Sequence, residues 1–400
     1  MKHHPTTCTL LAATLLTAGS AFAGPATPAP TGKEPPPPPK EEDCCDRFFG
    51  LATLYKNDSN PFIQEFALTG RYHGQFAGVD SDVGDEDGWD HRRFRLGFRA
   101  KLWHDFEFKN EMYGELNHDD FYSGLTESYL AWKPSDQFNL IVGKQKPKFS
   151  LDWSTSSREI VTLERNIMIN NLGIDYETGV SVSGKNGNWS YFAGAFNNDT
   201  GDPGDEREYG DLDGGWSWIA SLGYDLKDVT KLDKAVLRLD YINMDHDPVD
   251  DLLTRFDDAV ALSFNAKKGP FSLATEVLWA EGDRATQRGT DGTMWGFYIM
   301  PTYDINKRLQ LVARYTHGES DDNALRLQNR YERGGEIGGL TIPGGGYGER
   351  YNAYYLGLNY YICGHRLKIM TGLEYSEMES QNAGGDVDTW TWVTGLRTYF

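Results

Sequence analysis

The alternation of apolar and polar residues is the feature that most constrains what this chain can fold into, and residues 91–103, HRRFRLGFRAKLW, show it clearly. Phe94, Leu96 and Phe98 stand at even positions, whereas cations stand at odd positions. Successive side chains of a β-strand point to opposite faces, so a strand here has one cationic face and one apolar face. A helix would spread the same charges around its circumference, which makes helix the poorer interpretation.

Alternation of this kind continues from Ile63 almost to the end of the chain. Leu237, Leu239 and Tyr241, for example, share one parity and stand opposite Arg238 and Asp240. The pattern predicts sixteen strands, at residues 64–76, 91–103, 106–117, 124–133, 137–146, 178–185, 188–197, 216–226, 235–243, 259–267, 270–281, 293–304, 308–318, 351–362, 366–376 and 389–400.

The connections between these strands alternate in length. Short turns such as Asn186-Gly187 and Lys268-Gly269 carry hairpin signals. Long loops fall between them, at about 77–90, 147–177, 197–215, 244–258, 282–292, 319–350 and 377–388. Outer-membrane barrels sort their connections in this way, with short periplasmic turns and long external loops. We therefore predict an all-β fold, a transmembrane antiparallel β-barrel of about sixteen strands; soluble β-sandwiches or a propeller are the alternative.

Composition agrees with a barrel in a membrane. Hydrophobic residues make up 39% of the 400 residues and aromatic residues 13%. A soluble chain of this size should have a larger aliphatic core, so the apolar residues here are expected to face something other than the protein interior. No segment after the N-terminal apolar run approaches the roughly 18 apolar residues that a transmembrane helix needs, so insertion must use strands.

The N-terminal residues divide into three predicted segments. Residues 1–23 have a basic start, an apolar run and the cleavage signal Ala21-Phe22-Ala23, which predict a secretory signal peptide. Residues 24–43 are a Pro-rich linker that should be extended. Residues 44–62 form a short arm, either a helix or an extended segment, before a barrel at 63–400. The chain is thus expected in the outer membrane, in contact with its lipid.

Acidic residues dominate the formal net charge of -20, and they gather in the long loops, especially 77–90, 197–215 and 244–258. The plain interpretation is that these loops are solvated outside the cell. Bridging to lipid headgroups through divalent cations is the alternative, although no loop has EF-hand spacing.

Few residues could hold a metal or a disulfide. Cys44, Cys45 and Cys363 remain after the signal peptide, and a bond between adjacent cysteines would be strained. A link from this pair to another chain or to Cys363 stays open. No regular ligand spacing predicts a metal site, and no cofactor and no nucleic-acid partner are expected.

Strand 91–103 predicts a cationic wall inside the barrel. A charge that faces lipid near the midplane costs about 2–4 kcal/mol, so the apolar parity should face outward and the cations inward. A barrel of about sixteen strands encloses a water-filled channel. The predicted ladder consists of Arg93, Arg95, Arg99 and Lys101. It is either an anion track or a set of ion pairs with acids of the next strand, at Glu107, Glu111 and Glu115.

The loop after the fifth strand is a second candidate for the channel lining. Strict alternation fails at Lys144 and Lys146, which should lie at the rim or at a bulge. We predict that residues 147–177 fold inward and narrow the channel. The loop carries cations at Lys148, Arg158 and Arg165, and acids at Asp152, Glu159 and Glu164.

Three runs resemble the phosphate-selective porin O and P family: RRFRLGFRAKLWHDFEFKNEMY, ESYLAWKP and GKQKPKFSLDWSTSSREIVTLERN. The resemblance implies a sixteen-stranded homotrimeric porin with a basic lumen that passes small inorganic anions such as phosphate. By matching positions it implies lumen or constriction cations at Arg93, Arg95, Lys144, Lys146, Lys148, Arg158 and Arg165. The end of the chain, Phe400 on an amphipathic strand, resembles the assembly signal of outer-membrane barrels.

Three other functions stay open. A general or cation-preferring diffusion porin differs only in selectivity. A barrel enzyme is not expected, because the chain has nine His, mostly in turns and loops, and no G-x-S-x-G. A structural or adhesive barrel would not conduct ions, so bilayer conductance separates it from a porin.

Overall fold

The computed structural model describes residues 44–116, 121–197, 208–209, 215–244, 256–282, 291–327, 331, 337 and 340–400. The predicted signal peptide and Pro-rich linker lie outside these residues. The chain divides into two compact units, Met1–Leu51 and Ala52–Phe400. In the first unit, Cys44–Gly50 forms helix α1, so the arm begins with a short helix. Cys45 and Cys363 are disulfide-bonded cysteines.

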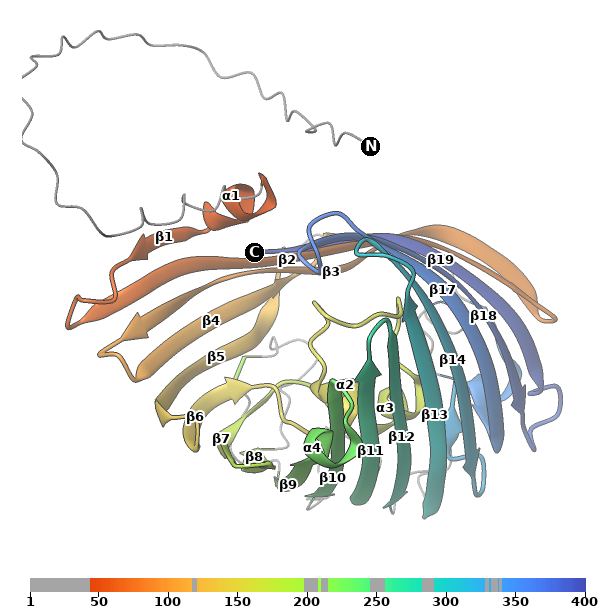
Figure 1. Ribbon diagram of the computed structural model, residues 1–400. Helices are drawn as coiled ribbons and strands as arrows, with labels where there is room; N and C mark the ends of the chain where they lie inside the picture. The colour runs from red at the N-terminus through yellow and green to blue at the C-terminus, as the bar shows by residue number, and fades with distance from the viewer. Residues whose placement is uncertain are drawn as a thin grey trace, which may run out of the picture. The chain divides into compact units, whose positions relative to one another are not determined.

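The second unit is a closed barrel of sixteen antiparallel strands (Figure 1). Each strand pairs with its neighbours in the barrel, and β19 pairs with β2 to close it. The strands are β2 (Ile63–Ser81), β3 (Gly84–Leu102), β4 (Phe106–Gly114), β5 (Tyr122–Ser135), β6 (Phe138–Gln145), β7 (Glu177–Asn186), β8 (Trp189–Asn197), β9 (Trp216–Asp225), β10 (Lys234–Met244), β11 (Asp258–Lys268), β12 (Phe271–Gly282), β13 (Gly292–Asp304), β14 (Leu309–Ser320), β17 (Arg350–Tyr361), β18 (Leu367–Glu379) and β19 (Val387–Tyr399). The predicted fold class is confirmed, and each predicted strand is present.

Smaller elements lie before and between these strands. They are β1 (Thr53–Lys56), which pairs with β2, the helices α2 (Leu151–Ser154), α3 (Ile167–Leu172) and α4 (Lys227–Thr230), the two-residue strands β15 (Leu325–Arg326) and β16 (Tyr347–Gly348), and the 3-10 helix η1 (Pro343–Gly346). Among the described residues, no helix combines the length and the apolar character needed to cross a membrane.

One predicted loop is a pair of strands. Residues 77–90 were expected as a long acidic loop, but β2 continues to Ser81 and β3 starts at Gly84. Pairing runs to Ser81↔Gly84, and a tight turn at Gly84, with φ of 145°, needs a residue without Cβ. The Gly- and Asp-rich composition suggested a loop, whereas buried Ala77 and Val79 keep the alternation of a strand.

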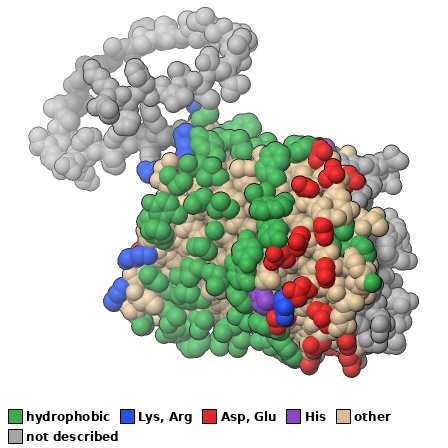
Figure 2. Space-filling model, turned by 90° about the vertical axis from the view of Figure 1, so that its right-hand side faces the viewer, with side chains coloured by type: hydrophobic (Ala, Val, Ile, Leu, Met, Phe, Trp, Pro, Cys, Tyr) green, Lys and Arg blue, Asp and Glu red, His purple; other side chains and the backbone are tan. Residues whose placement is uncertain are grey.

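The apolar residues of the alternating pattern lie on the outer face of the barrel. Leu222, Leu239, Leu262, Val277, Leu356 and Leu373 are among its exposed large side chains. Figure 2 shows hydrophobic side chains across the middle of this face, with Lys and Arg at one end and Asp and Glu at the other. The arrangement is that of an apolar belt between two polar borders, as a lipid bilayer requires.

The seam between the first and last strands extends to the end of the chain. Gly70 and Phe400 exchange two backbone hydrogen bonds of 3.1 Å. The Phe400 ring covers Gly70 so closely that a Cβ there would lie 2.2 Å from the ring. Glycine is therefore required at residue 70 for this ring position.

Residues 146–176, here called the third loop, lie inside the barrel with α2 and α3 (Figure 1). Their apolar side chains, among them Phe149, Met168 and Leu172, belong to the same buried cluster as Phe196 and Met294 of the wall. The prediction that this loop folds inward is confirmed.

Candidate functional site

The third loop is held against the inner wall by side chains from the last strands. Lys368 of β18 donates to the carbonyl of Ile160 at 2.7 Å, and Asn359 of β17 donates to that of Val161 at 2.8 Å. Arg397 of β19 donates to the Leu163 carbonyl in the same way. These wall side chains satisfy buried carbonyls that an irregular loop cannot pair within itself, so the loop keeps one position.

The start of the loop is anchored at another part of the wall, on β12. The Ser150 hydroxyl donates to the Glu276 carboxylate of β12 at 2.7 Å, and the Leu151 amide donates to the same group. The Ser150 hydroxyl also accepts from the Asp152 and Trp153 amides, which caps α2. The loop is therefore fixed to the wall both at its start, on β12, and farther along, on β17 to β19.

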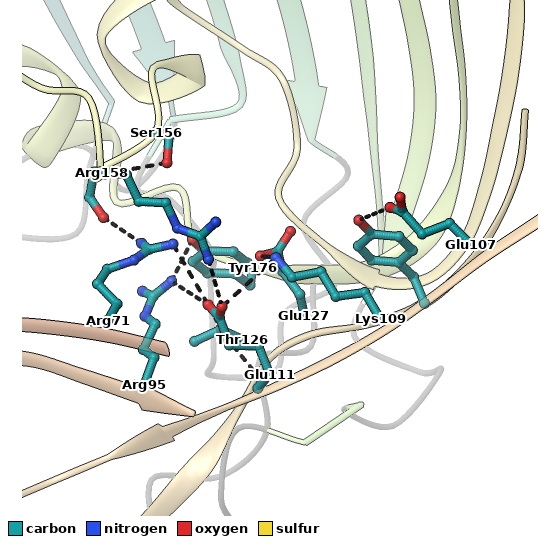
Figure 3. Close-up of polar contacts among 12 residues, drawn as sticks. Arg71, Arg95, Glu107, Lys109, Glu111, Thr126, Glu127, Ser156, Arg158 and Tyr176 are labelled. Atoms are coloured by element: carbon teal, nitrogen blue, oxygen red, sulfur yellow. Dashed lines mark hydrogen bonds and ion pairs between the residues drawn. The ribbon is translucent and has the colours of Figure 1, made fainter. Parts of the chain in front are cut away.

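The carboxylate of Glu111, on β4, lies near four cationic side chains (Figure 3). Its carboxylate is fully buried and lies 3.2 Å from Arg158 of the third loop, 3.5 Å from Arg95, 3.8 Å from Arg71 and 3.9 Å from Lys109. Lys109 also pairs with Glu127, so two carboxylates face four cations and this part of the interior keeps a positive charge.

Glu164 is the corresponding acid on the loop itself. Arg92 of β3 binds it with two parallel hydrogen bonds of 2.9 and 3.1 Å. Burial by itself raises the pKa of this carboxyl, but Arg92, Arg93 and Arg397 outweigh it and hold the pKa well below its usual range. Glu164 is therefore ionised at neutral pH and ties the loop to β3.

A β-bulge explains how Arg92 reaches the interior. His73 pairs with Arg93 and Gln75 pairs with Asp90, so two residues of β3 stand opposite Gly74. A bulge shifts the alternation of side chains by one residue. Strict alternation would place Arg92 on the outer face with Phe94, so the sequence interpretation missed this interior cation.

Aromatic rings hold several of the other cations. Lys146 Nζ lies 4.4 Å from the ring centre of Trp153, and the guanidinium of Arg95 lies 4.8 Å from that of Tyr176. Arg158 lies over Tyr399 at 5.1 Å. An aromatic face attracts a cation without cancelling its charge, so these contacts position the cations and leave the field positive.

A cavity of about 880 Å³ opens toward the short-turn end of the barrel, along β5 to β10. Its charged lining consists of one acid, Asp136, and four cations, Lys133, Lys148, Lys185 and Arg238. Lys133 is paired with Glu107 at 2.9 Å and Arg238 with Asp240 at 2.5 Å. Among the described residues, no carboxylate lies within ion-pair distance of Lys148 or Lys185.

The predicted ladder divides into two parts. Arg93 and Arg95 are buried on the inner wall behind the third loop, at 8% and 7% exposure. Arg99 and Lys101 are more exposed and share Glu65 as ion-pair partner, Lys101 at 3.5 Å. Of the predicted acids, Glu111 is an ion-pair partner of the ladder, through Arg95. Glu65, which was not predicted, is the partner of Arg99 and Lys101.

The remaining predicted cations lie in different places. Lys146, Lys148, Arg158 and Arg165 belong to the third loop, where Arg165 pairs with Asp152 at 3.4 Å. Lys144 does not join them. It pairs in register with Ser128 and shares the parity of exposed Val142, so its side chain starts on the outer face, where it donates to the Glu208 carbonyl.

Sequence reasoning missed several interior cations, namely Arg71, Arg92, Arg314, Lys368 and Arg397. Except for Arg92, each occupies the inward parity of a strand that was predicted. Extending the rule used for residues 91–103 to all sixteen strands would have found them. Within the described ranges, no group of His, Cys, Asp and Glu is arranged to hold a metal ion.

The closed sixteen-stranded barrel, its apolar outer belt and its inward-folded third loop define a bacterial outer-membrane porin. The chain belongs to the family described as phosphate-selective porin O and P, whose model matches residues 66–400. None of the curated proteins compared with the chain matches it.

Solved structures share the fold at low sequence identity. The outer membrane channel DcaP of Acinetobacter baumannii has a TM-score of 0.54 and 14% identity, covering 87% of this chain and 100% of that chain. OmpF of Salmonella typhi, solved in complex with daunomycin, has a TM-score of 0.57 and 11% identity, with coverage of 87% and 100%. OmpT of Vibrio cholerae has a TM-score of 0.51 and 12% identity, with coverage of 86% and 100%.

Proposed function

We propose that this porin is an anion-preferring diffusion channel, that phosphate is the first solute to test, and that the channel assembles as a homotrimer. The observation that carries the selectivity is the lining of the cavity along β5 to β10, where four cations face one acid. Residues 157–164 of the third loop bind side chains of β2, β3, β4, β14 and β17 to β19, whereas Lys148 borders this cavity, so solutes are expected to pass on the side of the cavity.

Lys148 is the central residue of the proposal. It stands where the third loop leaves the wall, with its backbone carbonyl held by Ser221 at 2.9 Å and Arg238 at 3.0 Å. Its side chain lines the cavity and lies over Phe192 at 5.8 Å. The cation is thus positioned by a ring and by a fixed backbone.

Interior cations can outweigh the acidic loops in spite of the net charge of -20. Salt screens exposed charges over about 8–10 Å, so acids at the loop tips act weakly on an ion inside the barrel. A narrow interior with low-dielectric walls focuses the field of the charges that line it. The charges near the path therefore decide the selectivity.

The test is the reversal potential of the purified protein in a bilayer with a tenfold KCl gradient at pH 7. We expect a potential of the sign that chloride permeation gives, and block of the chloride current by phosphate. Lys148→Gln should shift the potential toward cation preference. Lys307→Gln, an exposed turn cation that does not line this cavity, removes the same charge and should leave it unchanged. Cation selectivity of the unmodified channel would overturn the proposal.

A further inference from the structure

Four basic side chains form one row across the inner wall, where the first and last strands of the barrel meet. Lys368 of β18 pairs in register with Arg397 of β19. His73 of β2 stands between Arg397 and Arg93 of β3. All four residues are buried, with exposures between 0 and 8%. Water therefore cannot solvate the charges of this row, and another group must stabilise them.

Carboxylates of the protein do not neutralise the row. Among the described residues, no carboxylate lies within ion-pair distance of Lys368, Arg397 or Arg93. Glu164 of the third loop lies nearby, but Arg92 binds both of its oxygens. A buried charge without a partner is strongly unfavourable, so the row needs negative charge from another source.

Several nitrogens of the row also lack a hydrogen-bond partner among the described residues. They are both ring nitrogens of His73, Nη1 of Arg93, and Nε and Nη1 of Arg397. Buried polar groups of folded proteins are nearly always paired, with protein, water or an ion. The four charged groups that act most strongly on the His73 ring are all cations, namely Arg397, Arg93, Arg71 and Lys368. The missing partner must therefore accept hydrogen bonds and carry negative charge.

The row gathers its nitrogens around one closed space. Neighbouring strands lie about 4.8 Å apart, so Arg93 and Arg397 leave the wall about 10 Å from each other, with His73 between them. The two arginine side chains are long enough to meet over the shorter His73 ring. The third loop covers the row, since Arg397 donates to the carbonyl of Leu163, and Leu163 is itself buried.

We propose that a halide ion, chloride under ordinary conditions, is bound between Arg93 and Arg397 and beside His73. Single donors from three strands suit a spherical anion, whereas an oxyanion needs donors for each of its oxygens. The ion neutralises the row and helps to hold the Leu163 segment, so it is a structural part of the folded channel. The proposal goes beyond the anion selectivity proposed above, because the row lies behind the third loop and does not line the cavity along β5 to β10.

Anomalous diffraction locates such an ion directly. Crystals of the porin grown in sodium bromide should show a strong bromide peak between Arg93 and Arg397, in contact with His73. The peak should disappear in Arg93→Gln. Density without an anomalous signal, as water gives, or bromide only at exposed cations of the turns would overturn the proposal.

Thermal unfolding of the purified porin in detergent measures the same site in solution. Its midpoint should rise as chloride replaces gluconate at constant ionic strength, because an ion that binds only the folded state stabilises it. Arg93→Gln should need at least tenfold more chloride for half of this rise.

Arg314→Gln is the matched control. Arg314 is also buried on the inner wall and also donates to a carbonyl of the third loop, that of Glu164 at 3.1 Å, but it has Glu374 as ion-pair partner at 2.9 Å. This variant should be less stable and should keep the chloride dependence of the unmodified porin.

His73→Phe covers the case in which Arg93→Gln fails to fold, because it removes the ring nitrogens and keeps a ring. It should weaken the chloride dependence of unfolding in the same direction. Equal chloride dependence in the unmodified porin and in these variants would overturn the proposal. An anion-selective channel without bromide at this site rejects the halide site alone, whereas a cation-selective channel that retains the bromide rejects the proposed function alone.

Discussion

The Arg158 guanidinium of the third loop lies 3.2 Å from the Glu111 carboxylate of β4, and Glu111 is fully buried. This pair connects the loop to the wall at the place where Arg71, Arg95 and Lys109 also converge. The Glu111 carboxylate therefore both holds the third loop in place and partly neutralises the cations on the wall.

Glu111→Gln should destabilise the barrel and increase its anion preference. Removing one partner of a buried ion pair leaves uncompensated charge and costs about 3–5 kcal/mol. Urea unfolding of the purified protein measures the first effect, and the reversal potential measures the second. Glu107→Gln is the matched control, since Glu107 has Lys133 as its ion-pair partner. Equal effects of the two variants would contradict the special role of Glu111.

Alkaline pH should weaken the anion preference through Lys148. Burial, and then the nearby Arg238, lower the pKa of Lys148 below that of a free lysine. As the pH rises, this group loses its proton at a lower pH than a free lysine does, so its cationic contribution falls on the alkaline side. Reversal potentials between pH 7 and pH 10 measure this. Lys148→Arg should keep the preference over the same range, and an unchanged pH dependence in that variant would refute the assignment.

Deleting residues 154–162 should raise the single-channel conductance several-fold. This segment holds Arg158 and the carbonyls of Ile160 and Val161, which fix the loop to β4, β17 and β18. Without these contacts the loop cannot occupy the same part of the lumen. Conductance of a correctly assembled deletion variant decides the point, and an unchanged value would show that the loop is not the constriction.

A small side chain in place of Gly318 should displace the third loop. A Cβ at Gly318 would lie 2.7 Å from the Met168 sulfur, closer than real contacts allow. Gly318→Ala is therefore expected to destabilise the folded barrel by about 1–3 kcal/mol, as overpacking does. Thermal unfolding measures the loss.

Met168→Ala in the same chain removes the clash and tests its cause. The loss of stability in the double variant should be smaller than the sum of the losses in the two single variants, because the two side chains compete for one space. If the losses of stability were strictly additive, the effect of Gly318→Ala would come from the backbone at residue 318 and not from a clash with Met168.

The strand pattern was predictable because the membrane enforces it. An outward position accepts apolar residues and an inward one accepts charges, so strand β3 could be assigned from the parity of Phe94, Leu96 and Phe98 alone. The bulge opposite Gly74 was not predictable, because a single extra residue changes the side of Arg92 without changing the composition.

The site was predictable in part for a related reason. Alternation reports a side chain's direction but not what lies in front of it, so Arg93 and Arg95 were placed inward while their burial behind the third loop was not foreseen. Lys144 was assigned to the lumen by family resemblance, whereas its register with Ser128 puts it outside. Loop contacts between residues far apart in sequence, such as Lys368 with Ile160, leave no local pattern to detect.

The anchors of the third loop have a consequence for the order of folding. The loop follows β6, yet the groups that hold its carbonyls come from Asn359, Lys368 and Arg397, about two hundred residues later in the chain. Contacts of such long sequence separation form late, because the intervening chain must first be ordered. The loop can therefore settle only when the last strands have joined the first ones, and its docking is the event that marks a completed barrel.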